Sequence, residues 1–146
     1  MGRVQLAINV TDLDLAVEFY SKLFRADPAK VRPGYANFAL DDPALKLVLI
    51  EGPEGGTLNH LGVEVGTTDQ VGEATRRLEA EGLRTRVEEA TSCCYAVQDK
   101  VWVNDPDGAP WEVYTVLADA PDAGMCADGQ CEVSATESRE TVRGCC

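Results

Sequence analysis

The sequence predicts an α+β protein made of two β-α-β-β-β modules, and three observations support this prediction. The segments QLAINV (residues 5–10) and HLGVEV (residues 60–65) alternate with a period of two, as half-buried strands do. Each segment is followed by a helical apolar pattern and then by three strand-like segments. A linker rich in glycine and proline separates the halves. We therefore expect modules at about residues 1–52 and 57–118, which together form one domain over residues 1–118.

In the first module, the opening strand leads into a helix expected at residues 12–25, with Thr11 as its N-cap. Helical periodicity indicates one apolar side, which consists of Leu13, Ala16, Val17, Tyr20 and Phe24. Three further strands are expected at residues 29–32, 35–40 and 45–51.

The second module repeats this order. A helix is expected at residues 69–81, capped by Thr68 and ended by Gly82. Its buried side is expected to hold Val71, Ala74 and Leu78. The strands that follow are expected at residues 84–88, 95–104 and 111–117. The sequence DPDG at residues 105–108 is a strong turn signal between the last two of them.

Residues 119–146 differ in composition from the rest of the chain. They contain no aromatic residue, six acidic residues and two basic residues, which predicts a flexible acidic tail. Four of the six cysteines lie here, namely Cys126, Cys131, Cys145 and Cys146. The spacing MCADGQC differs from CxxC and gives little support to a structural zinc site. The pair Cys145-Cys146 is interpreted as exposed, mobile thiols.

Charge and hydropathy exclude several classes of partner. The formal net charge of −12 argues against nucleic acid and anionic membranes, which select basic surfaces. No apolar run approaches the length of a membrane span, and the N-terminus leads into a strand without the apolar region of a signal peptide. We therefore expect a cytoplasmic protein with reduced cysteines, in which clustered cysteines suggest metal binding or reactivity.

Three residues are candidates for a metal site. His60 is the single histidine and opens the first strand of the second module; a lone histidine is more often a surface or satisfied core residue. Glu112 lies in the apolar run WEVYTV, where a carboxylate needs a partner to offset its desolvation. Gln5 occupies the position in the first module that His60 occupies in the second. Imidazole, carboxylate and amide oxygen together suit Fe(II), Mn(II) or Ni(II), and three ligands leave positions open for substrate or oxygen.

Glu51 is an alternative fourth ligand. When EVYTV is laid over LVLIE, Leu47 and not Glu51 comes opposite Glu112. Glu51 is therefore interpreted as a strand-end residue at the linker.

The adjacent Cys93 and Cys94 have two readings. Neighbouring cysteines rarely bond to each other, because the ring they would close strains the disulfide. They are either two small buried hydrophobic residues in a strand or a pair of thiols presented to a substrate. A mobile loop between two strands would carry the second kind of pair.

The paired modules, His60 at the start of a strand and the sequence DPDGAPWE resemble the vicinal oxygen chelate superfamily over residues 3–117. This superfamily includes glyoxalase I, fosfomycin-resistance and bleomycin-binding proteins and extradiol dioxygenases. The resemblance implies a cupped mixed sheet around a metal site. The segments YANFAL, LKLVLIE, GGTLNHLGVEV, QDKVWV and WEVYTVLAD, with the adjacent cysteines, resemble more narrowly the organoarsenical carbon–arsenic lyases, often labelled cadmium-induced.

The narrower resemblance implies a function and a role for each candidate residue. Gln5, His60 and Glu112 would hold Fe(II), while Cys93 and Cys94 would bind trivalent arsenic. The enzyme would use dioxygen to convert methylarsenite and aromatic arsenicals to arsenite, which an arsenite efflux system would then remove. A non-catalytic cadmium- or arsenic-sequestering protein and another glyoxalase-like enzyme are the alternatives. The sequence leaves open the preferred organic group, and whether the site forms within one chain or across a homodimer.

Overall fold

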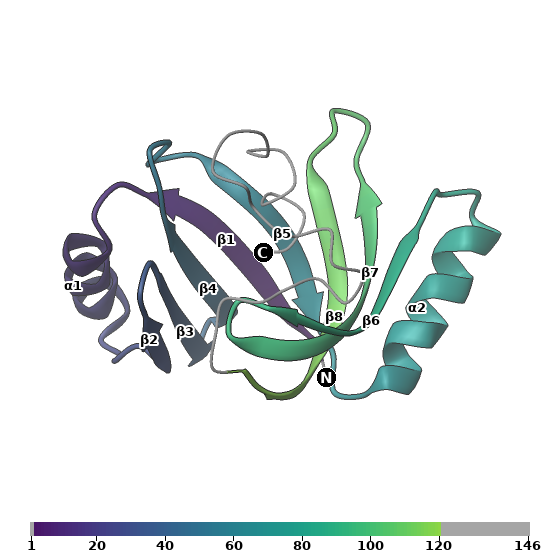
Figure 1. The fold of residues 1–146 in the computed structure, drawn as a ribbon, viewed down its shortest axis with the longest axis horizontal. Helices are drawn as coiled ribbons and strands as arrows, with labels where there is room; N and C mark the ends of the chain where they lie inside the picture. The colour runs from purple at the N-terminus through teal and green to yellow at the C-terminus, as the bar shows by residue number, and fades with distance from the viewer. Residues whose placement is uncertain (1, 121–146) are drawn as a thin grey trace. The chain divides into compact units, whose positions relative to one another are not determined.

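The computed structural model describes residues 2–120, and their elements follow the predicted β-α-β-β-β order twice (Figure 1). These residues divide into two compact units. The first unit is Arg3–Leu61, and the second consists of Gly2 and residues 62–120 of the described chain. The predicted tail lies almost entirely outside the described residues, together with Cys126, Cys131, Cys145 and Cys146. In the part of the chain that is described, no helix is long and apolar enough to cross a membrane.

The first unit is a sheet with one helix. Its elements are β1 (Arg3–Val10), α1 (Leu13–Phe24), β2 (Lys30–Arg32), β3 (Tyr35–Asp41), β4 (Ala44–Glu51) and the start of β5 (Leu58–Glu64). The strands lie in the order β2-β3-β4-β1-β5. Strands β1 and β4 are parallel, whereas β3 is antiparallel to both β2 and β4. This order places the opening strands of the two modules, β1 and β5, next to each other.

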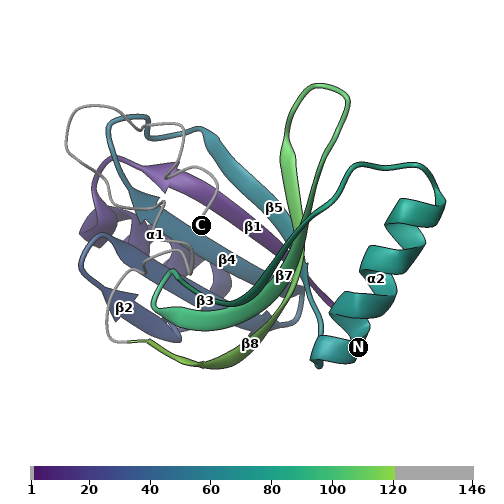
Figure 2. The same ribbon diagram turned by 45° about the vertical axis from the view of Figure 1, so that its right-hand side comes forward.

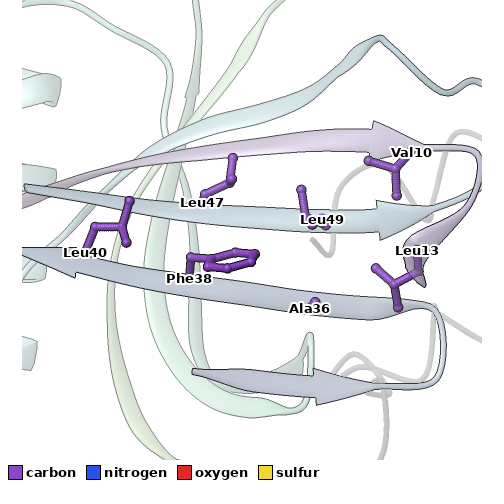
Figure 3. Close-up of a cluster of buried hydrophobic side chains, with 7 residues drawn as sticks. All are labelled: Val10, Leu13, Ala36, Phe38, Leu40, Leu47 and Leu49. Atoms are coloured by element: carbon purple, nitrogen blue, oxygen red, sulfur yellow. The ribbon is translucent and has the colours of Figure 1, made fainter. Parts of the chain in front are cut away.

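The core of the first unit lies on one face of β3 and β4 (Figure 3). Seven buried side chains form it: Val10, Leu13, Ala36, Phe38, Leu40, Leu47 and Leu49. The predicted apolar side of α1 packs against this cluster through Ala16, Val17, Tyr20 and Phe24, which confirms the periodicity argument. Burial of a Leu or Phe side chain contributes about 1.5–3 kcal/mol, so this cluster supplies much of the unit's stability.

Helix α1 is capped by Asp12 rather than by Thr11, which corrects the predicted cap. Asp12 has an extended backbone, and its Oδ1 accepts a hydrogen bond of 3.0 Å from the backbone N–H of Leu15. The Thr11 side chain instead lies against Gly55, where a Cβ atom would collide with it. The linker therefore needs glycine at that position.

The second unit contains the end of β5, one helix and three further strands of the sheet. The helix and these three strands are α2 (Thr68–Ala80), β6 (Arg86–Cys93), β7 (Ala96–Asn104) and β8 (Pro110–Asp119). The strands lie in the order β8-β7-β6, and both pairs are antiparallel. Figure 2 shows the long β7–β8 hairpin, which turns at the predicted DPDG sequence. Val71 and Leu78 of α2 pack against Val101 of β7. The helical periodicity predicted that Val71 and Leu78 lie on the buried side of this helix.

Both ends of α2 are defined by specific hydrogen bonds. The N-cap is Thr67, one residue before the predicted Thr68, and it forms a capping box with Gln70. At the other end Gly82 has a φ of 82°, as its predicted role as the stop residue requires. The N–H of Gly82 bonds to the carbonyl of Glu79, and the N–H of the next residue bonds to that of Leu78, which is the Schellman arrangement.

Strand β6 is the element whose extent differs most from the prediction. It was expected at residues 84–88 but runs from Arg86 to Cys93, with an irregularity in its pairing to β7 between Glu88 and Thr91. Ala90 in this interval has a φ of 46°. The strand therefore carries Cys93 as its last residue.

Candidate functional site

Gln5 and His60, the equivalent residues of the two modules, lie next to each other on β1 and β5. Both side chains are buried, with 4% and 2% of their surface exposed. Gln5 Nε2 lies 3.0 Å from His60 Nε2. The duplication argument, which matched these two positions, is therefore confirmed for this pair.

The hydrogen bonds of His60 define which ring nitrogen carries the proton. His60 Nδ1 lies 2.8 Å from Asn59 Oδ1. A carbonyl oxygen can only accept, so Nδ1 must donate. In the neutral ring Nε2 is then unprotonated and accepts the amide N–H of Gln5. A histidine that binds a metal through Nε2 has the same arrangement, with its other nitrogen donating to a fixed acceptor.

The Gln5 amide also suits a cation. It now presents its Nε2 donor to the imidazole. A half-turn of the terminal amide exchanges Nε2 for Oε1 and brings an oxygen donor beside the Nε2 lone pair of His60. One nitrogen and one oxygen donor would then lie on adjacent strands, which fits a borderline divalent ion such as Fe(II), Mn(II) or Ni(II).

Glu112 in the second unit has a buried lysine as its partner. Its Oε2 accepts a hydrogen bond of 2.7 Å from Lys100 Nζ, and the two residues are 2% and 1% exposed. The rings of Trp102 and Tyr114 flank the ammonium, with centroids 5.3 and 5.9 Å from Nζ. The sequence argument expected a partner for this carboxylate but did not identify Lys100.

Burial alone would lower the pKa of Lys100, but Glu112 and, to a lesser extent, Cys93 outweigh it and raise the pKa above its ordinary value. Lys100 is therefore a buried cation at neutral pH. A thiol and a carboxylate, both candidates from the sequence, share this one positive charge.

Hairpin register could have identified Lys100 from the sequence. The turn between β7 and β8 pairs Trp102 with Glu112 and Lys100 with Tyr114. Lys100 is thus the diagonal neighbour of Glu112, within reach of a long side chain on the same face. Counting back from DPDG gives this register, so the signal was present.

The complete set of Gln5, His60 and Glu112 remains a prediction. The first two lie in the first unit and Glu112 lies in the second. Within residues 2–120 there is no group of three or more His, Cys, Asp or Glu side chains arranged to hold a metal ion. The predicted set contains only two residues of those four types, because its third member is an amide.

The cysteine pair lies at a tight hairpin turn between β6 and β7, where the sequence argument expected a mobile loop between two strands. Cys93 ends β6 and pairs with Ala96 at the start of β7. Cys94 and Tyr95 between them have φ values of 50° and 60°, as in the two-residue turns that join antiparallel strands. Cys93 is therefore a strand residue, and Cys94 is the first residue of the turn.

The two cysteines differ in burial. Cys93 carries a reduced thiol with 1% of its surface exposed, whereas Cys94 is half-buried. The carbonyl of Cys93 accepts a hydrogen bond of 3.3 Å from Gln98 Nε2, which ties the hairpin end to β7.

Glu51 binds the N-terminus of helix α1. It ends β4, and its Oε2 accepts a hydrogen bond of 2.8 Å from the backbone N–H of Leu13. This N–H belongs to the first residue of α1, so the carboxylate satisfies one of the unpaired donors at the helix start. The interpretation of Glu51 as a strand-end residue is consistent with this contact.

The sequence profile described as "Glyoxalase/Bleomycin resistance protein/Dioxygenase superfamily" matches residues 2–113. The chain belongs to this superfamily. Its α+β fold, built from two β-α-β-β-β modules, is the fold that the sequence predicted.

Within the superfamily the chain is similar to several named proteins. It is 59% identical over 133 residues to the "Trivalent organoarsenical cleaving enzyme" of Thermomonospora curvata, covering 90% of this chain and 88% of the relative. It is 56% identical over 151 residues to the "Cadmium-induced protein CadI" of Mycobacterium tuberculosis, covering 93% of this chain and 99% of the relative.

Solved superfamily structures show the same fold. The Mn(II)-bound glyoxalase from Novosphingobium aromaticivorans has a TM-score of 0.60 at 20% identity and matches 82% of this chain and 42% of its own. The 2,3-dioxygenase LapB from Pseudomonas sp. KL28 has a TM-score of 0.62 at 19% identity, with 81% and 42% covered.

Proposed function

We propose that this protein is an Fe(II)-dependent enzyme that uses dioxygen to cleave the carbon–arsenic bond of trivalent organoarsenicals. Methylarsenite and aromatic arsenicals are the proposed substrates, and arsenite is the product. The observation that carries the proposal is the position of Lys100, which bonds to Glu112 at 2.7 Å and lies near enough to Cys93 for their charges to attract each other. A proposed arsenic-binding residue and a proposed metal ligand thereby share one buried cation. The similarity to organoarsenical-cleaving enzymes supports the choice of substrate.

The cysteine pair would capture the arsenical. An organoarsenical R–As(OH)2 exchanges two hydroxyls for two sulfurs, and the two thiol protons leave with those hydroxyls as two molecules of water. The bond between carbon and arsenic stays intact. Arsenic(III) is soft and prefers thiolates to oxygen ligands. Both cysteines must be reduced for this reaction, because a disulfide has no thiol to exchange.

Gln5, His60 and Glu112 would hold the metal. The buried Gln5–His60 pair, with Nε2 of the ring unprotonated, supports the first two ligands. Lys100 holds one carboxylate oxygen of Glu112 and so orients this side chain. Fe(II) bound there would supply the redox chemistry that lets dioxygen react at the carbon attached to arsenic. The burial of all three side chains keeps bulk water from competing for them.

Arsenite release tests the proposal. The protein is fully reduced, freed of reductant, loaded with Fe(II) without oxygen and given methylarsenite. Arsenite should appear only after oxygen is admitted, and neither apoprotein nor an anaerobic sample should release it. Release that needs neither iron nor oxygen would overturn the proposed chemistry.

A second candidate is a cadmium- or arsenic-sequestering protein without catalysis. The name of the Mycobacterium tuberculosis relative favours it, as does the net charge of −12. Such a protein would bind methylarsenite stoichiometrically and return it unchanged after oxygen is admitted. It would also have no use for the buried Gln5–His60 pair, so the Gln5→Ala and His60→Ala variants would bind as the parent does.

The proposed location and functional partner of the enzyme follow from the toxicity of its product, arsenite. Arsenite is toxic inside a cell, so a cytoplasmic enzyme of this kind would work together with an arsenite efflux system. A homodimer is a further part of the proposal.

A further inference from the structure

A chain of hydrogen bonds runs from His60 to the linker between the modules, and the proposed function does not account for it. His60 Nδ1 lies 2.8 Å from Asn59 Oδ1, and Asn59 Nδ2 donates to Asn9 Oδ1 at 3.0 Å. Asn9 Nδ2 donates to Thr57 Oγ1 at 2.9 Å. Thr57 Oγ1 donates to the backbone carbonyl of Glu54 at 2.6 Å. All five residues lie in the first unit.

The last acceptor fixes the direction of every bond in this chain. The carbonyl of Glu54 can only accept, so the Thr57 hydroxyl donates its single hydrogen to this carbonyl. Thr57 Oγ1 must then accept from Asn9, which presents Nδ2 to it and Oδ1 to Asn59. Asn59 in turn presents Nδ2 to Asn9 and Oδ1 to His60. The amide orientations, which similar N and O atoms would otherwise leave open, follow from this one backbone carbonyl.

The backbone holds the chain in place. The N–H of Asn9 bonds to the carbonyl of Thr57, and the N–H of Gly56 bonds to the carbonyl of Asn9, both at 2.9 Å. The linker is therefore attached to the end of β1. Gly55 approaches Thr11 too closely to admit a side chain, which keeps the linker against this strand.

We propose that Asn59, oriented by Asn9 and Thr57, is a positioning residue that keeps His60 in the tautomer with the proton on Nδ1. The bond that one ring nitrogen makes decides which nitrogen is protonated. Here it leaves the Nε2 lone pair of a buried ring facing Gln5. The use of that lone pair for a metal rests on the proposed function, whereas the tautomer itself does not.

The single histidine of this sequence makes the tautomer directly measurable. In metal-free protein labelled with ¹⁵N-histidine, at a pH where the ring is neutral, NMR reports one imidazole. We expect a pyridine-type signal for Nε2 and a pyrrole-type signal for Nδ1. The Asn59→Leu variant, similar in size but without an acceptor, should move both signals toward the opposite tautomer. Thr57→Val should move them less in the same direction, because only the far end of the chain is lost.

Two further variants separate positioning from general disturbance. Asn59→Asp keeps an oxygen for Nδ1 and should restore the parent signals. Asn37→Leu makes the same change at a buried asparagine on β3, whose Nδ2 bonds to the Tyr35 hydroxyl, and should leave the His60 signals unchanged. A parent ring with the proton on Nε2 would overturn the inference, as would unchanged signals in folded Asn59→Leu. The spectrum of the parent protein still decides the tautomer of His60 if Asn59→Leu fails to fold.

Metal affinity gives the second readout. In competition with a chelator under anaerobic conditions, Asn59→Leu should bind Fe(II) about 10–100-fold more weakly than the parent, the usual effect of losing a residue that orients a histidine ligand. Equal affinity would contradict the positioning role for a metal. A parent protein that binds no Fe(II) would instead overturn the proposed function, and the tautomer measurement would still decide the role of Asn59.

Discussion

At the scale of single residues, each unit contains a pair of buried polar side chains that bond to each other. Gln5 meets His60 in one unit, and Glu112 meets Lys100 in the other. A polar group loses its hydration on burial and must regain hydrogen bonds within the protein, so each member of such a pair stabilises the burial of the other. Removal of one member should therefore cost more than the bond itself.

Lys100→Met should destabilise the metal-free protein by about 3–5 kcal/mol, because it leaves the carboxylate of Glu112 buried without its cation. The double variant Lys100→Met with Glu112→Gln should recover part of this loss, since no buried charge remains. The stabilisation by Lys100 is present in full below pH 10.5, the ordinary pKa of lysine, and is lost as the pH rises through the higher folded-state value.

Urea unfolding measures the difference, and the exposed pair of Lys22 and Glu18 supplies the control. These side chains are 74% and 62% exposed, so Lys22→Met should leave the unfolding midpoint unchanged. A Lys100→Met variant as stable as the parent would contradict the buried-pair account.

Some of these residues could be predicted from the sequence and others could not. The duplication matched Gln5 with His60, because equivalent positions of two similar modules lie on equivalent strands. The apolar surroundings of Glu112 predicted that it needs a partner but not which residue provides it. That identity depends on the β7–β8 register, which follows only from the position of the turn.

At the scale of elements, the order of helices and strands follows from periodicity, but their ends depend on local competition. Both N-caps were predicted one residue away from their true positions. Adjacent residues with capping side chains compete there, Thr11 with Asp12 and Thr67 with Thr68. The hairpin turn at Cys94-Tyr95 was missed because it has positive φ values without the glycine or asparagine that usually marks such a turn.

Asp99 joins three elements of the second unit and is predicted to stabilise their arrangement. Its Oδ1 accepts from the backbone N–H of Ala90, where the pairing of β6 shifts, and its Oδ2 accepts from Thr68 Oγ1 at the start of α2. Asp99→Ala should destabilise the protein by about 1–3 kcal/mol, because the N–H of Ala90 loses its acceptor. Urea unfolding gives the free energy, and hydrogen exchange should show loss of protection at Ala90. Unchanged protection at Ala90 would show that Asp99 does not hold the irregular part of β6. Asp41→Ala, at an exposed end of β3, is the matched control.

At the scale of the whole molecule, the proposed metal ligands come from both units, which no single module could supply. His60→Ala and Glu112→Ala should each remove iron and activity, because two remaining ligands hold a divalent ion poorly. Gln5→Ala should weaken iron binding more mildly, since an amide oxygen is the poorest donor of the three. Elemental analysis after anaerobic loading measures the effect. Stoichiometric iron in His60→Ala would show that the metal lies elsewhere.

The sequence could not decide whether ligands from the two units form one metal site. Each unit's internal pairs follow from strand register, but a site that draws on two units depends on how they meet. Periodicity and spacing carry no information about that arrangement. The duplication and the apolar surroundings of Glu112 nominated the three ligands, the resemblance to the organoarsenical lyases implied Fe(II), and variants of both units must test the set.

The central claim is that Cys93 and Cys94 hold the arsenical while a separate set of residues holds the iron. The most direct test measures iron content and methylarsenite cleavage side by side in Cys93→Ser and Cys94→Ser. Serine is nearly isosteric with cysteine, so the fold should persist, and both variants should keep the parent's iron content while losing methylarsenite binding and arsenite release. Cleavage at the parent rate in both variants would contradict the claim and return the cysteine pair to a packing role.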